Sequence, residues 1–213
     1  LAHEMGHAIH TYYSDKTQPY RYSGYLIFVA EVASTCNECL LNHYLLEHET
    51  EAKNRNYILN HYLENFRTTL FRQTMFAEFE KIVHEKTALG ESLTKDELNK
   101  IYHDLNVRYY GPDVVVDNEI DYEWMRIPHF YTAFYVYQYA TGFSAAVAFS
   151  KKILEEGQPA VDRYVKEFLS GGCSKDPIDL LAAAGVDMST PHPVEDALSV
   201  FAKYLDEFEK QMA

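Results

Sequence analysis

The 213-residue sequence has only three cysteines, and it has no long apolar run. An odd and small number of cysteines favours free thiols in a reducing compartment over a disulfide framework. No segment approaches the roughly 18 uncharged apolar residues of a membrane-spanning helix, and no signal peptide opens the chain. We therefore expect a cytoplasmic protein with no membrane partner.

Basic residues are also scarce, with 19 Lys and Arg against 32 Asp and Glu and a net charge of −13. Nucleic acids and anionic lipids bind clustered Lys and Arg, so we expect no nucleic-acid partner. Cys36 and Cys39 form a CxxC inside an apparent helix, without a second pair. We interpret them as buried small side chains and not as a redox or zinc site.

Strand patterns are nearly missing, because Val114–Val116 is the only β-like run and is too short for a sheet. Helical patterns cover most of the chain, and Thr94 with Glu97 predicts a capping box. We predict an all-α fold in one domain, residues 1–213. The expected helices span about 1–17, 27–64 with a bend near 48–53, 66–88, 95–109, 129–155, 158–170, 177–184 and 193–211.

The first seven residues contain a HExxH pattern formed by His3, Glu4 and His7. Side chains four positions apart lie on one face of a helix, so both imidazoles can point at a single metal ion. Glu4 stands next to His3, where its carboxylate can reach a metal-activated water as a general base. The alternative is a helix with two histidines that bind no metal.

A catalytic zinc ion needs a third protein ligand, and the best candidate is Glu31. It lies in an apolar stretch that is typical of a buried helix, where an unpaired carboxylate would be costly. A turn-rich segment before it lets this second helix return beside the first. Glu38 shares the face of Glu31 and either orients a ligand histidine or pairs with Arg or Tyr at a helix contact.

Several motifs together resemble the oligoendopeptidase F group of the thimet oligopeptidase superfamily of zinc peptidases. They are HEMGHAIH, YSGY, AEVASTCNE, YYGPDVVVDNEIDYEWMRIPHFYTAFYVYQYATG and GGCSKDPIDLLAAAGVDM, which span nearly the whole chain. The resemblance implies that His3, His7 and Glu31 bind one Zn²⁺ and that Glu4 is the base. This agrees with the interpretation from spacing.

The most aromatic stretch follows Pro128 and places Tyr131, Tyr135 and Tyr139 at helical spacing. Core packing explains such a stripe, although buried tyrosine hydroxyls need partners. The resemblance implies instead that His129 with Tyr135 and Tyr139 hold the substrate and polarise its scissile carbonyl. This segment aligns with the family motif only with a shift of about one residue. Which of the two tyrosines donates a hydrogen bond to the carbonyl therefore stays open.

Two other features have competing interpretations. His10 follows His7 by almost one turn and is either packed or a hydrogen-bond donor near the metal. The acidic segment 117–123 is expected to be a solvated loop, with a calcium site as the alternative.

We therefore expect a zinc metalloendopeptidase that cleaves internal bonds of short peptide substrates with a zinc-activated water. The alternatives are a metal-free helical scaffold or peptide-binding module, and a zinc enzyme acting on another amide. No capping residue precedes the first ligand helix, so we expect a fragment whose missing N-terminal part supplies the other wall of the cleft. Alone, such a fragment would be weak or inactive.

Overall fold

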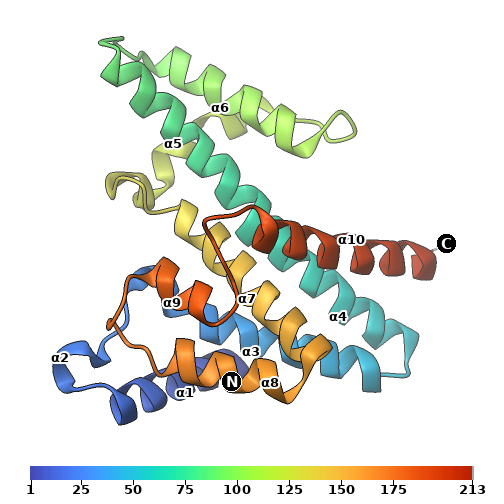
Figure 1. Cartoon of the computed structure of the whole chain (residues 1–213). Helices are drawn as coiled ribbons and strands as arrows, with labels where there is room; N and C mark the ends of the chain where they lie inside the picture. The colour runs from blue at the N-terminus through green and yellow to red at the C-terminus, as the bar shows by residue number, and fades with distance from the viewer. Residues whose placement is uncertain (213) are drawn as a thin grey trace. The chain divides into compact units, whose positions relative to one another are not determined.

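The computed structural model describes residues 1–212, a chain of helices joined by turns and loops (Figure 1). Two compact units are present: residues 1–66 with the chain from Thr141 onward, and residues 67–140. Every regular element within residues 1–212 is helical, which confirms the all-α prediction. The expected single domain over residues 1–213 stays a prediction.

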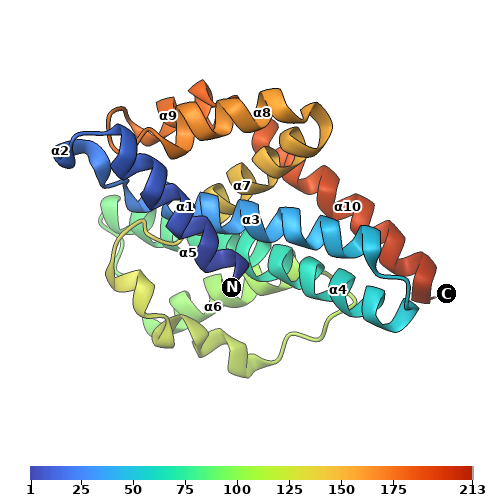
Figure 2. The ribbon, with the colours of Figure 1, turned by 90° about the horizontal axis from the view of Figure 1, so that it is seen from below.

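The first unit carries the HExxH helix. α1 runs alongside α3, and α10 runs alongside α4 (Figures 1 and 2). α3 ends and α4 begins on either side of residues 49–51, so the predicted bend is confirmed as a break. The elements are α1 (Ala2–Thr17), α2 (Tyr20–Ser23), α3 (Ile27–His48), α4 (Ala52–Asn65), α7 (Tyr137–Glu156, in this unit from Thr141), α8 (Gln158–Arg163), the π-helix η4 (Tyr164–Leu169), α9 (Pro177–Ala183) and α10 (His192–Met212).

The core of this unit is a buried cluster of side chains from α3, α7, η4 and α9. α7 contributes mainly small side chains to it. Val29, Val32, Ala33 and Cys36 of α3 belong to one buried cluster with Ala145, Ala146, Ala148 and Phe149 of α7 and with Phe168, Leu169, Leu180 and Leu181. Cys36 and Cys39 are free and buried, and burial raises the pKa of the Cys39 thiol to about 11.

The second unit is built on the hairpin of α5 (Arg72–Ala88) and α6 (Lys95–Tyr110), which pack together. The π-helix η1 (Phe66–Phe71) leads into α5, and two 3₁₀ helices follow α6: η2 (Asn118–Arg126) and η3 (Pro128–Tyr131). The predicted capping box at the start of α6 is confirmed, since Thr94 and Glu97 bond each other's backbone N–H groups. Its core contains Met75, Phe76, Phe79, Tyr102, Leu105, Ile127 and Val136.

Two expectations for this unit are wrong. The acidic segment is not a loop, because residues 118–126 form η2 and Glu123 is buried. The aromatic stretch is not one continuous helix, because η3 ends at Tyr131 and α7 begins at Tyr137.

Among the helices of the described residues, none combines the length and apolar character that crossing a membrane requires.

Candidate metal centre

Three predicted ligands meet at one point of the first unit: His3 and His7 on α1 and Glu31 on α3, here called the ligand triad. The two Nε2 atoms of the histidines are 3.2 Å apart. Glu31 Oε2 lies 3.3 Å from each of them. Within residues 1–212, this is the only group of three His, Cys, Asp or Glu side chains whose ligand atoms converge in this way.

The spacing of the ligand triad fits a tetrahedral zinc ion. Ligand atoms at about 2.0–2.2 Å from such an ion lie about 3.3–3.6 Å from one another, because the edge of a tetrahedron is about 1.6 times its centre-to-corner distance. The observed separations of 3.2, 3.3 and 3.3 Å are close to this range. Two imidazole nitrogens and one carboxylate oxygen are also a donor set that zinc prefers.

Gly6 brings the two ligand helices together. A Cβ at this position would lie 2.5 Å from Ser34 Cα and 2.6 Å from the Ala33 carbonyl oxygen. Only glycine therefore permits the observed approach of α1 to α3. Glu31 is fixed locally, because the Ser34 hydroxyl donates to its Oε2 at 2.9 Å. The sequence interpretation missed both contacts, although a glycine inside HExxH and the small pair Ala33-Ser34 were visible signals.

The surroundings of the ligand triad show which group Glu38 faces and how exposed Glu31 is. Glu38 Oε1 lies 3.4 Å from His3 Nδ1, so it faces a predicted ligand histidine and not an Arg or Tyr. Glu31 was expected to be buried, but its side chain is 50% exposed. The reason is that Val29, Val32 and Ala33 occupy the core side of α3. Glu4 is exposed in the first turn of α1.

His10 is packed inside the first unit. Its ring is 1% exposed and stacks on Tyr25 with centroids 3.8 Å apart and planes 3° apart. The Phe168 ring also packs against it, with ring centroids 4.9 Å apart. Burial, and then the neighbouring His7, lowers the pKa of His10 to about 4. These contacts favour the packed interpretation over a donor beside the metal.

The other predicted site residues form an aromatic cluster in the second unit: His129, Tyr135 and Tyr139. The His129 and Tyr135 rings stack with centroids 5.6 Å apart, and the Tyr139 hydroxyl lies 3.3 Å from His129 Nε2. Tyr135 and Tyr139 meet edge to face at 5.6 Å. Tyr131 is 90% exposed, so the predicted three-tyrosine stripe is wrong; the turn between η3 and α7 assembles the cluster.

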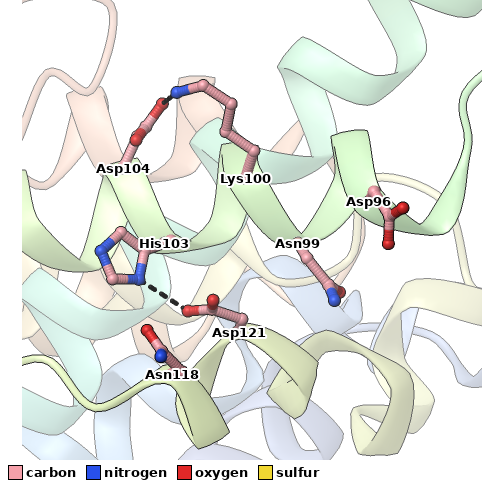
Figure 3. A pocket seen from close by; sticks show the side chains of 7 residues that line it. All are labelled: Asp96, Asn99, Lys100, His103, Asp104, Asn118 and Asp121. Carbon is pink, nitrogen blue, oxygen red and sulfur yellow. Dashed lines mark hydrogen bonds and ion pairs between the residues drawn. The ribbon is translucent and has the colours of Figure 1, made fainter.

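A polar pocket of about 380 Å³ lies between α6 and η2 (Figure 3). Its three acidic side chains are paired: Asp121 Oδ1 is 2.7 Å from His103 Nδ1, Asp104 binds Lys100, and Asp96 Oδ1 lies 3.5 Å from Lys95 Nζ. Glu123, on the same 3₁₀ helix, accepts hydrogen bonds from Tyr102 and Arg72. Since these carboxylates already bind protein donors, the pocket does not support the calcium alternative for the acidic segment.

Comparison with known proteins decides the family. The sequence model of peptidase family M3 matches residues 1–200. The chain belongs to this peptidase family. Among M3 relatives, the oligopeptidase PepF of Bacillus subtilis is 58% identical over 210 residues, which is 99% of this chain and 31% of the relative. The chromosomal oligoendopeptidase F of Lactococcus lactis subsp. cremoris is 47% identical over 99% of this chain and 35% of its own length.

A solved M3 structure has the same fold. The crystal structure of oligoendopeptidase-F from Enterococcus faecium superposes with a TM-score of 0.89 and 46% identity, over 99% of this chain and 38% of that one. The resemblance to the oligoendopeptidase F group is thereby confirmed. The chain spans about one third of the length of the relatives it matches.

Proposed function

We propose that the protein is a zinc-dependent endopeptidase that hydrolyses internal bonds of short oligopeptides. The convergence of the ligand triad beside Glu4 of the HExxH motif carries the proposal. The names of the relatives, oligopeptidase and oligoendopeptidase, support the reaction and the substrate class. The proposal concerns the whole protein, because this chain covers only 31–38% of those relatives.

The residues around the ligand triad have distinct proposed roles. Zinc bound there would supply a Lewis acid and lower the pKa of water to about 7. Glu4 takes the proton from the attacking water and passes it to the leaving amine, a role worth about 10²- to 10⁴-fold in rate. Glu38, whose Oε1 lies 3.4 Å from His3 Nδ1, would hold the proton of the imidazole on Nδ1, so that the lone pair of Nε2 is available to the metal.

We further propose that the aromatic cluster holds the substrate. His129 and the two tyrosines carry imidazole and phenol groups that can donate hydrogen bonds to a carbonyl oxygen. A donor that meets developing negative charge is worth about 3 kcal/mol. Tyr139 is the tyrosine whose hydroxyl touches His129, while Tyr135 contacts it through the ring.

The test compares Glu4→Gln with the unmodified whole protein. Zinc is counted by elemental analysis, and cleavage is followed with internally quenched peptides graded by length. We expect about one zinc per chain in both proteins and a turnover lower by about 10²- to 10⁴-fold in the variant. Asp15→Asn is the matched control, because it removes another exposed acid from α1. Normal turnover in Glu4→Gln, or cleavage that survives full removal of zinc, would reject the proposal.

A further inference from the structure

Phe134 has an unusual backbone conformation beside the aromatic cluster. Its φ of 59° is the only positive value at a non-glycine residue within residues 1–212. This left-handed region brings the Cβ of an L-residue close to its own backbone, so a bulky side chain adopts it only when the surroundings hold it there.

Two side chains of α5 hold this residue. Glu80 Oε1 accepts the backbone N–H of Phe134 at 2.7 Å, and Glu80 is only 5% exposed. This distance is at the short end of the normal range of about 2.7–3.2 Å for an N–H···O hydrogen bond. One helical turn later, His84 contacts the Phe134 ring with centroids 4.6 Å apart. Both the backbone and the ring of Phe134 are therefore fixed from α5.

The conformation of Phe134 matters for its neighbours in sequence. The left-handed residue turns the chain between η3 and α7, so that Tyr135 returns onto the ring of His129. We propose that Glu80 is a positioning residue for the hydrogen-bond donors that stabilise the transition state: by holding the Phe134 backbone, it sets where Tyr135 lies against His129. This inference rests on the proposed function, because it assumes that the aromatic cluster holds the substrate.

Core stability alone does not explain the strained turn. Phe134 is 52% exposed, so the left-handed conformation does not serve to bury its ring in the core. What the turn achieves is contact among three side chains that carry an imidazole and two phenol groups. Backbone strain beside a group of hydrogen-bond donors is typical of a preorganised site.

The test uses the whole zinc-loaded protein and separates kcat from KM. Glu80→Ala removes the acceptor, and we expect kcat to fall about 10- to 100-fold with zinc content unchanged and KM within about threefold, since a misplacement of about 1 Å can cost about 100-fold. Glu80→Gln keeps an oxygen that accepts the Phe134 N–H and should retain most activity. Glu85→Ala is the matched control, an exposed acid on the same helix that pairs with Lys81.

A second variant tests the route through the backbone. Glycine adopts positive φ without strain, so adding Phe134→Gly to Glu80→Ala should restore most of the lost kcat. The inference is overturned if Glu80→Ala keeps normal kcat, if Glu80→Gln loses as much as Glu80→Ala, or if the glycine restores nothing.

Hydrogen exchange of the Phe134 amide keeps the inference testable if Glu80→Ala does not fold. We expect slow exchange in the unmodified protein and in Glu80→Gln, and fast exchange in the unmodified protein would overturn the inference. Failure of the proposed function looks different: the unmodified protein would hold no zinc and cleave no peptide, while the Phe134 amide would still exchange slowly.

Discussion

Gly6→Ala tests how the two ligand helices set the metal centre. The new Cβ would lie 2.5 Å from Ser34 Cα, where an ordinary carbon–carbon contact needs about 3.5 Å. α1 must therefore move away from α3 by about 1 Å. The ligand atoms are only 3.2–3.3 Å apart, and adding about 1 Å would place Glu31 Oε2 beyond the reach of an ion bound to both histidines.

The magnitude follows from two opposing effects of the alanine. Overpacking costs about 1–3 kcal/mol, while alanine favours the helix over glycine by about 1 kcal/mol. We therefore expect a loss of at most about 2 kcal/mol in the free energy of unfolding. The larger effect should be on zinc affinity, which we expect to fall by at least about 10- to 100-fold, the loss that is typical when a group that positions a metal ligand is changed.

The assay is a competition titration with a chromophoric zinc chelator. Gly24→Ala is the matched control, because a Cβ there has no atom within 4 Å and φ is −74°. It should bind zinc as the unmodified protein does. The reasoning is refuted if Gly6→Ala also binds zinc with normal affinity while folded, since helix separation would then not control the metal centre.

Two predictions concern stability. The folded-state pKa of His10, about 4, lies below its unfolded value of 6.5. The stability that comes from burying neutral His10 is therefore fully present above pH 6.5 and falls by about 3 kcal/mol as the pH drops toward 4. In urea unfolding with a chelator present, the free energy of unfolding of His10→Phe should depend less on pH than that of the control His192→Phe, which changes an exposed histidine. Equal pH dependence in the two variants would contradict this. Glu123→Ala leaves Arg72 without its buried carboxylate and should cost about 3 kcal/mol or more of unfolding free energy, whereas Glu91→Ala, in an exposed pair with Lys86, should leave the unfolding free energy nearly unchanged. Similar losses in both would show that burial of the pair is unimportant.

The sequence predicted those features that depend only on residues close together in the chain. His3 and His7 share a helix face because they are four residues apart, whatever the rest of the chain does. Thr94 and Glu97 cap α6 for the same kind of reason. Glu31 was identified as an acid in a largely apolar stretch that was expected to be buried, yet its side chain is 50% exposed. The residue was therefore found through a premise that the structure corrects.

Features that depend on distant residues could not be predicted. Tyr135 meets His129 through a turn whose left-handed residue is held by Glu80, more than 50 positions earlier in the chain. Helical spacing alone therefore gave a stripe that included Tyr131, which is exposed. The approach of α1 to α3 likewise depends on Gly6 meeting Ser34, a contact that no periodicity within either helix reveals.

The most direct test is a crystal structure of the zinc-loaded whole protein with anomalous data at the zinc absorption edge. We expect one anomalous peak about 2.0–2.2 Å from His3 Nε2, His7 Nε2 and a carboxylate oxygen of Glu31. A peak bound to other residues, or a zinc-loaded structure in which Glu31 turns away from the two histidines, would contradict the account.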